Sequence, residues 1–205
     1  MAQPDDVLEF WFADACESPE ATAARSEFWF TANPETDKDV WQFFGDVMID
    51  AAAGFYDNWT DTAHGRLALI LVLDQFPRNI FRGTSEVYVH DARALELAGQ
   101  GVTLGQLAGL TVPEQAFFLM PYQHSEDISV QRAGVALMQA MVDEATEEWR
   151  KVAAGYFDFA VRHHDIVAAY GRFPHRNNLL GRSSTEAEDL FLAEGGESFG
   201  QAGQN

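Results

Sequence analysis

The chain lacks the residues on which several classes of protein depend. Cys16 is the only cysteine among 205 residues, so an intrachain disulfide and a cluster of thiolate metal ligands are both excluded. The longest apolar run is far shorter than the roughly 20 residues that a membrane-spanning helix requires. No segment alternates polar and apolar residues as a half-buried strand would. These absences indicate an all-α protein with no membrane partner.

Basic residues are also scarce, and lysine is the scarcest of them. Thirteen basic residues face 32 acidic ones, which gives a formal net charge of -19, and only Lys38 and Lys151 are lysines. A surface this acidic repels nucleic acids and anionic membranes, so neither is expected as a partner. The first twelve residues carry acids and no base, unlike a secretory or transit peptide, so a cytoplasmic location is expected.

The predicted helices share recognisable first turns. A capping residue or a proline precedes apolar residues at helical spacing near Pro4, Ser18, Asn33, Thr111 and Ser184. The helix after Asn33 is predicted to extend to about Trp59, and the aromatic residues of the first third are interpreted as core. With 47% hydrophobic content, the sequence predicts one all-α domain over residues 1–194 and a mobile Gly- and Gln-rich tail over residues 195–205.

A buried central helix is predicted at about residues 63–76. Its residues Leu67 to Leu73 are apolar without interruption, which indicates a helix enclosed on every face. Polar groups presented by such a helix are partly desolvated, and they need partners. The polar residues that follow directly are Asp74, Gln75, Arg78, Asn79 and Arg82. The sequence therefore predicts a polar site at this end of the central helix.

Three prolines share one sequence pattern. Pro77, Pro121 and Pro174 each follow an apolar helical run and precede a group of polar residues. Because proline has no N–H and clashes with the preceding turn, a helix is expected to end or kink at each of them. After Pro121 come Tyr122, His124, Ser125, Glu126 and Asp127; after Pro174 come His175, Arg176, Asn177 and Arg182. Side chains beyond a helix break can bond the freed carbonyls or face a cavity.

Two segments around these prolines, residues 75–85 and residues 166–185, contain no acidic residue. The arginines that they hold are Arg78, Arg82, Arg172, Arg176 and Arg182. If the two segments meet in space, they form a patch for a carboxylate or a phosphate. The alternative is an internal ion network in which Asp74, Glu126 and Asp127 neutralise the arginines, so that no ligand is needed.

A reaction in this pocket would need a group that titrates near neutral pH. The candidate catalytic residues are His124, His175 and Glu126, but the sequence does not decide whether the protein is an enzyme. No metal site is predicted, because the chain has no His-Glu-x-x-His pair, and no cofactor is expected. Cys16 is interpreted as part-buried and unreactive.

Three long motifs, together with the opening Phe10-Trp11-Phe12, resemble one family of bacterial proteins. They are LALILVLDQFPRNIFRGT (residues 67–84), PYQHSED (residues 121–127) and YGRFPHRNNLLGRSST (residues 170–185). From about Val7 to Leu192 the chain resembles domain-of-unknown-function family 924. The resemblance implies an all-helical, tetratricopeptide-like fold of antiparallel helix pairs, and it brings no settled activity. The matching motif positions are Asp74, Gln75, Arg78, Asn79, Arg82, His124, Ser125, Glu126, Arg172, His175, Arg176 and Asn177.

The preferred hypothesis is a polar pocket that binds a small anionic metabolite or a phosphoryl group. The full predicted ligand-binding set is Asp74, Gln75, Arg78, Asn79, Arg82, Tyr122, His124, Glu126, Arg172, His175, Arg176 and Asn177. Its arginines would hold the anion, and its histidines would donate hydrogen bonds or shuttle a proton. The alternative is a tetratricopeptide-like module that binds a protein or peptide, with the polar motifs purely structural. The sequence indicates no oligomeric state.

Overall fold

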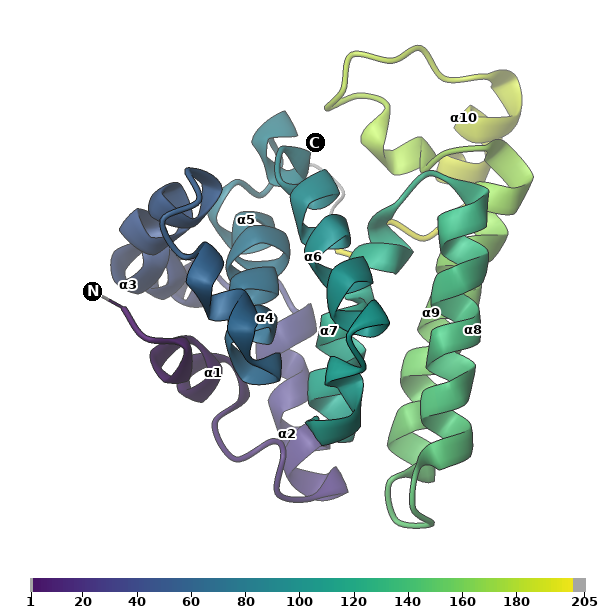
Figure 1. The fold of residues 1–205 in the computed structure, drawn as a ribbon. Coiled ribbons are helices and arrows are strands. Elements are labelled where there is room, and N and C mark those ends of the chain that lie inside the picture. Colours follow the sequence, from purple (N-terminus) through teal and green to yellow (C-terminus); the bar gives the residue numbers. More distant parts are fainter. Residues whose placement is uncertain (1, 201–205) are drawn as a thin grey trace.

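Helices make up all the regular structure of the computed structural model, which describes residues 2–200 (Figure 1). The α-helices are α1 (Pro4–Phe12), α2 (Pro19–Phe30), α3 (Pro34–Ala52), α4 (Ala63–Ile70), α5 (Phe76–Ile80), α6 (Asp91–Thr103), α7 (Val112–His124), α8 (Ile128–Glu144), α9 (Arg150–Tyr170) and α10 (Glu186–Ala193). The shorter elements are a π-helical turn at Leu71–Gln75 and 3-10 turns at Asp57–Asp61, Ser85–Tyr88, Gln106–Gly109 and Pro174–Arg176. The predicted all-α fold is confirmed.

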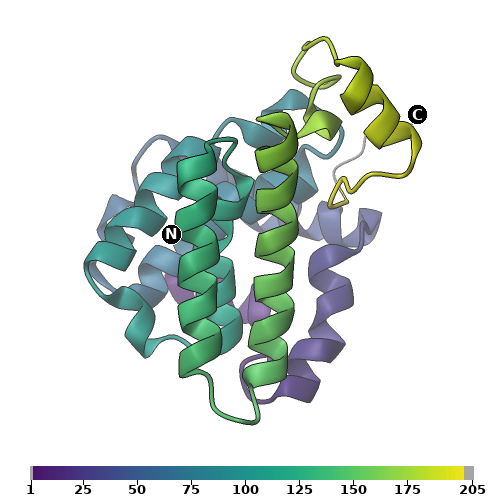
Figure 2. The ribbon, with the colours of Figure 1, turned by 90° about the vertical axis from the view of Figure 1, so that its right-hand side faces the viewer.

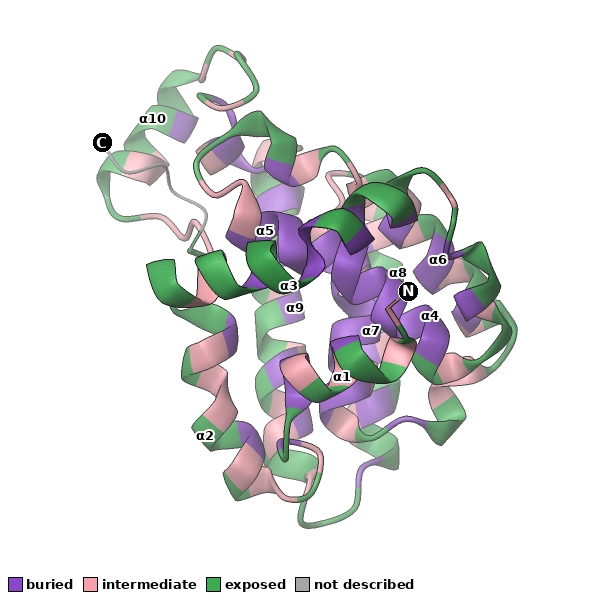
Figure 3. Ribbon diagram, turned by 90° about the vertical axis from the view of Figure 1, so that its left-hand side faces the viewer, coloured by how far each residue is buried: buried purple, intermediate pink, exposed green. Residues whose placement is uncertain are grey.

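The predicted central helix is a continuous run made of α4, the π-helical turn and α5. It extends beyond the predicted residues 63–76 to Ile80, and every residue from Gly65 to Asn79 is buried (Figure 3). α1, α3, α6 and α7 all pack against this run, so it is enclosed on every side. The apolar run Leu67 to Leu73 therefore forms the centre of the core, and the polar residues after it emerge inside the protein.

The sequence predicts that a helix ends or kinks at each of these prolines, and no helix ends at Pro77 or Pro121. Before Pro77, the π-helical turn shifts the hydrogen bonding, and Phe76 N–H donates to the Leu71 carbonyl five residues back. This wider turn lets the chain pass into α5 with Pro77 in its first turn, where a missing N–H is tolerated. Pro121 lies inside α7, which continues to His124.

The predicted helix from Asn33 to Trp59 is also too long. α3 ends at Ala52 because Gly54 adopts a left-handed backbone with a φ of 87°. Phe55 N–H then donates to the Asp50 carbonyl at 3.0 Å, a bond that closes helix ends of this type.

The remaining helices pack around this core. α8 and α9 form a long antiparallel pair, and α7 packs between this pair and the central run (Figure 1). Figure 2 shows α2 on the opposite side of α9 from α8. The tetratricopeptide-like pairing and the single-domain division at residue 194 stay predictions. Among residues 2–200, no helix combines the length and apolar character needed to cross a membrane.

The described part of the predicted mobile tail, residues 195–200, folds back toward α9. Phe199 stacks on His163 with ring centroids 3.6 Å apart, and Arg82 Nη1 donates to the Gly200 carbonyl at 3.3 Å. An aromatic residue in a polar segment explains why the chain docks here, because the ring removes apolar surface from water. Residues 201–205 lie outside the described residues.

Candidate functional site

A cavity of about 760 Å³ lies between α2, α5, α7, α9 and the chain that follows α9. This volume is typical of small-molecule sites. All three proline-linked groups of polar residues contribute to its wall, so the segments predicted from the sequence converge. The polar side chains that line it include Gln75, Arg78, Asn79, Arg82, Gln123, His124, His163, His175 and Arg176.

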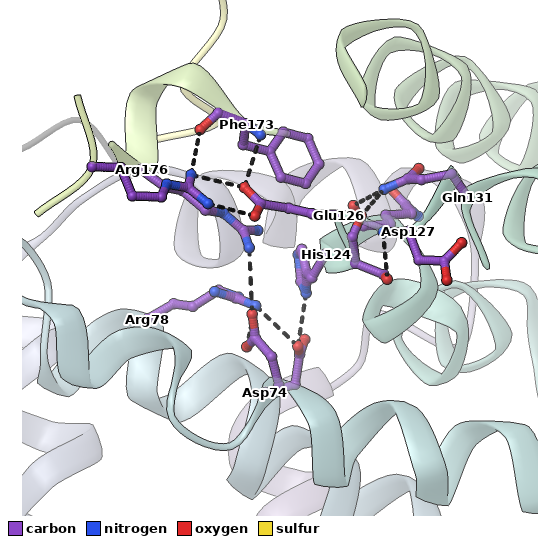
Figure 4. Close-up of polar contacts among 12 residues, drawn as sticks. Asp74, Arg78, His124, Glu126, Asp127, Gln131, Phe173 and Arg176 are labelled. Carbon is purple, nitrogen blue, oxygen red and sulfur yellow. Dashed lines mark hydrogen bonds and ion pairs between the residues drawn. The ribbon is translucent and has the colours of Figure 1, made fainter. Parts of the chain in front are cut away.

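Asp74 and His124 form a buried pair at the base of the cavity (Figure 4). The Asp74 side chain is fully buried, and its Oδ1 lies 2.7 Å from His124 Nδ1 and 3.1 Å from Arg78 Nη2. Its Oδ2 accepts a hydrogen bond from Gln75 Nε2 at 2.5 Å. Every hydrogen-bonding partner of the carboxylate is therefore supplied by a neighbouring side chain in the same cluster.

The charge state of this pair follows from its surroundings. Burial alone would raise the pKa of Asp74, but His124 and Arg78 outweigh it and hold that pKa well below its usual range. Burial, and then Arg78, lower the pKa of His124, so the ring is neutral at pH 7. Because an ionised carboxylate can only accept, His124 carries its proton on Nδ1. Nε2 is left with a lone pair at the cavity wall, able to accept a hydrogen bond or a proton.

Arg78 bridges two carboxylates. Its Nη2 donates to Asp74 Oδ1 at 3.1 Å and to Asp91 Oδ1 at 2.8 Å. The same two interactions raise its pKa against the effect of complete burial. Arg82 and Asn79 are held in a similar way, since both donate to Asp37 at distances from 2.8 to 3.2 Å. These cavity-lining cations are thus fixed by acids from α3 and α6.

Arg176 differs from these arginines. It is only 7% exposed, and its guanidinium carbon lies 4.4 Å from the Phe173 ring centroid and 4.5 Å from that of Tyr88. Its Nε is buried without a hydrogen-bond partner among the described residues, and Asp91 Oδ2 is 3.7 Å from Nη1, beyond hydrogen-bond reach. Burial lowers its pKa. A buried guanidinium with unused donors is costly unless something else satisfies it.

Two further histidines face the cavity beside Arg176. Burial, together with Arg176, lowers the pKa of His175 to about 3, and its Nδ1 has no partner among residues 2–200. Burial, and then His124, lower the pKa of His163 well below its ordinary value. Its Nδ1 lies 2.8 Å from the Phe159 carbonyl, a distance at which the ring donates. Both rings are therefore neutral at pH 7.

Comparison with known proteins identifies the family. The model for a family described as bacterial protein of unknown function, DUF924, matches residues 7–196. The chain belongs to this family. A solved structure of a protein of unknown function from Agrobacterium tumefaciens is 33% identical in sequence, with a TM-score of 0.79. The match covers 93% of this chain and 97% of that one, and no curated protein matches the sequence.

Membership of the DUF924 family confirms the predicted resemblance and supports the all-α fold. It assigns no activity, so the chemistry has to be argued from the positions of the side chains. Seven of the predicted ligand-binding residues line the cavity: Gln75, Arg78, Asn79, Arg82, His124, His175 and Arg176.

The other predicted residues lie outside the cavity wall and bond to protein groups. Arg172 forms a two-bond pair with Glu188, and Glu126 accepts from Arg182 and from Phe173 N–H at 2.8 Å. Asn177 accepts from Arg182 Nε at 2.9 Å. Figure 4 shows Glu126 turned toward Phe173 and away from the Asp74 pair.

Tyr122 and Asp127 also have structural positions. Tyr122 packs against Gly134 where α7 and α8 approach closely. A Cβ added to Gly134 would lie only 2.7 Å from the Cβ of Tyr122. Asp127 caps α8 by accepting from Ser129 N–H at 2.7 Å, so it neutralises no cavity arginine.

The sequence reasoning missed both the acids behind the cavity and its apolar wall. Asp37 and Asp91 lie near the starts of α3 and α6, where acidic residues are common, and no local pattern marks them as partners of distant arginines. The interpretation of the aromatic residues in the first third as core is confirmed for Trp11, Phe12, Trp29 and Phe44. It is wrong for Phe30, Trp41 and Phe43, which are exposed, and Phe30 lines the cavity. Tyr156, Phe159 and His163 are spaced by three and four residues, so they share one face of α9. This helical spacing is the signal that could have identified Tyr156 and Phe159 as cavity residues.

Metal binding and thiol chemistry receive no support from the described residues. Within residues 2–200, no group of three His, Cys, Asp or Glu side chains is placed to hold a metal ion. Burial raises the pKa of Cys16 to about 11, so its thiol is protonated at pH 7 and a poor nucleophile.

Proposed function

We propose that the cavity binds a small anionic ligand through Arg176. The observation that carries this proposal is a buried guanidinium in the cavity wall with donors that no described residue uses. An anion would accept charge-assisted hydrogen bonds from those donors. Arg78 and Arg82 already bond to aspartates, so they position the wall, and the ligand is assigned to Arg176.

The histidines complete the proposed site. His124, oriented by Asp74, places Nε2 at the cavity wall, where it accepts a hydrogen bond from the ligand or exchanges a proton with it. His175 lies beside Arg176, and its unpartnered Nδ1 is a second hydrogen-bonding position. Asp74 touches no ligand in this arrangement and acts by fixing the tautomer and orientation of His124.

A thermal-shift panel of inorganic phosphate, sulfate and short carboxylates tests the proposal. An anion at a hundredfold excess over its Kd should stabilise the wild type by about 2.7 kcal/mol. Arg176→Met should remove this shift, since it keeps the apolar length of the side chain and deletes the charge. The matched control is Arg93→Met, because Arg93 pairs with Asp57 and Glu96 on the surface. If every anion shifts Arg176→Met as much as the wild type, the proposal fails.

The peptide-binding alternative is supported by exposed aromatic side chains on α3, Trp41 and Phe43. These lie outside the cavity, so the two candidate functions predict different variants. A partner captured in a pull-down through this surface should be lost with Phe43→Ser and retained with Arg176→Met. The opposite pattern would favour the cavity.

A further inference from the structure

The cavity has two chemically different ends. One face of α9 carries Val152, Tyr156, Phe159 and His163, spaced by four, three and four residues, so all four line the same cavity wall. At 1.5 Å per residue, this face extends roughly 16 Å from Val152 to His163. It is apolar at the Val152 end and polar at the His163 end, where Arg176 also lies. A ligand lying along α9 would therefore meet an apolar surface first and a cation last.

Between the two ends, this face of α9 is covered by aromatic rings that remain half exposed. Phe30 from α2 stacks on Phe159 from α9, with ring centroids 6.3 Å apart and planes 16° apart. Despite this contact, Phe30 is 48% exposed and Phe159 is 44% exposed. Large apolar side chains left open in the wall of a concave site mark a surface that binds apolar groups. The exposed parts of these two rings are not packed in the core and are available to a ligand.

At the polar end, Arg176 offers guanidinium donors that no carboxylate among residues 2–200 accepts, although it lies 3.7 Å from Asp91. Arg78 is bonded to Asp74 and Asp91, and Arg82 is bonded to Asp37. Only Arg176, of the arginines in the described cavity wall, lacks a hydrogen-bonded carboxylate. One available guanidinium matches the two oxygens of a carboxylate, whereas a phosphate monoester brings up to two charges.

We propose that the ligand is a carboxylate carried on an extended apolar body. Its carboxylate pairs with Arg176, and its body lies along α9 against Phe30 and Phe159. This inference rests on the proposed anion site, and it adds the class of molecule that the site selects. An uncharged apolar molecule would leave Arg176 unsatisfied, and a short carboxylate would leave the aromatic end exposed.

Isothermal titration calorimetry with butanoate, hexanoate, octanoate, 1-octanol and octyl phosphate tests the inference. Affinity for the wild type should rise about fourfold for each methylene from butanoate to octanoate. Octanoate should bind at least tenfold more tightly than 1-octanol and more tightly than octyl phosphate. A series that rises less than twofold from butanoate to octanoate would overturn the apolar body, and tighter binding of octyl phosphate would overturn the carboxylate.

Two variants separate the two halves of the ligand. Phe159→Ser should weaken octanoate about tenfold and leave butanoate unchanged, whereas Arg176→Met should weaken both at least tenfold. Phe55→Ser is the matched control for Phe159→Ser, because Phe55 is 69% exposed and lies outside the cavity. Equal loss of octanoate in Phe55→Ser and Phe159→Ser would show non-specific binding and overturn the inference.

The failures of the two proposals are distinguishable. If butanoate and octanoate bind equally and both depend on Arg176, the anion site stands and the apolar body is wrong. If 1-octanol binds as tightly as octanoate, and Arg176→Met changes neither, both the anion site and the carboxylate are wrong.

Discussion

Arg78 and Arg176 face the same cavity and approach the same aspartate, yet they are held in opposite ways. Arg78, on the central run, makes hydrogen bonds to Asp74 and Asp91 at 3.1 and 2.8 Å. Arg176, in the segment after α9, lies between the rings of Tyr88 and Phe173 and stays 3.7 Å from Asp91. Arg78 is held by two carboxylates that accept hydrogen bonds from its Nη2, whereas Arg176 is positioned by stacking and makes no hydrogen bond to a carboxylate among residues 2–200.

This difference separates stability from function within one cluster. A buried ion pair joined by hydrogen bonds contributes mainly to the stability of the fold, because removing one partner leaves the other buried and unpaired. A buried cation with unused donors destabilises the ligand-free protein. An anionic ligand that accepts hydrogen bonds from those donors would offset this destabilisation. Substituting Arg78 should therefore change mainly the stability of the protein, and substituting Arg176 should change mainly its binding of a ligand.

The largest expected effect is on stability in Arg78→Ala. The substitution strands the fully buried carboxylate of Asp74 and removes one bond from Asp91, so the free energy of unfolding should fall by about 3–5 kcal/mol. Urea denaturation measures this loss. The control is Arg93→Ala, whose exposed ion pairs should contribute no more than about 1 kcal/mol. A loss in Arg78→Ala no larger than in the control would show that the cluster is not a structural network.

The histidines beside the two arginines give a pH dependence of intermediate size. Burial lowers the pKa of His124 and His163 and brings that of His175 to about 3, whereas each titrates near 6.5 in an unfolded chain. Below pH 6.5 the unfolded state binds more protons than the folded state. The stability that these neutral rings confer is therefore complete above that pH and is lost progressively as the pH falls toward their folded pKa values.

Urea denaturation at pH 7.5 and pH 5.5 measures this loss, and His175→Gln isolates one ring. The variant should lose about 1 kcal/mol less than the wild type between these two pH values. His164→Gln is the control, because His164 lies on the outer side of α9 and pairs with Asp165. Equal pH dependence in the wild type and His175→Gln would mean that His175 is not held neutral beside Arg176.

The sequence predicted the polar segments of this cluster better than their partners. The apolar run before Asp74 and the absence of acids around Arg78 and Arg176 marked two segments that do meet at one cavity. Arg172 and Arg176 lie only four residues apart in one acid-free segment, yet the first pairs with Glu188 on α10 and the second enters the cavity. That choice depends on where α10 packs, and no local spacing encodes it.

The acids that hold the arginines were missed for a related reason. Asp37 is 45 residues from Arg82, and such a contact leaves no periodic signal in a single sequence. The π-helical turn was missed as well, because proline rules describe an ideal helix and the widened turn before Pro77 escapes them. Composition and periodicity therefore predict the helices and the core, whereas long-range packing determines which arginines make hydrogen bonds to carboxylates.

The smallest expected effect on stability belongs to Arg176→Met, and it tests the comparison most directly. Methionine can keep the contacts with Tyr88 and Phe173, and it removes a buried charge that makes no hydrogen bond within the described residues. The free energy of unfolding should therefore stay within about 1 kcal/mol of the wild type or rise. Asp91 Oδ1 keeps its bond to Arg78 in this variant, and Oδ2 loses only the 3.7 Å ion pair with Arg176. A loss near that of Arg78→Ala would make Arg176 a second structural cation and remove the reason to assign it a ligand.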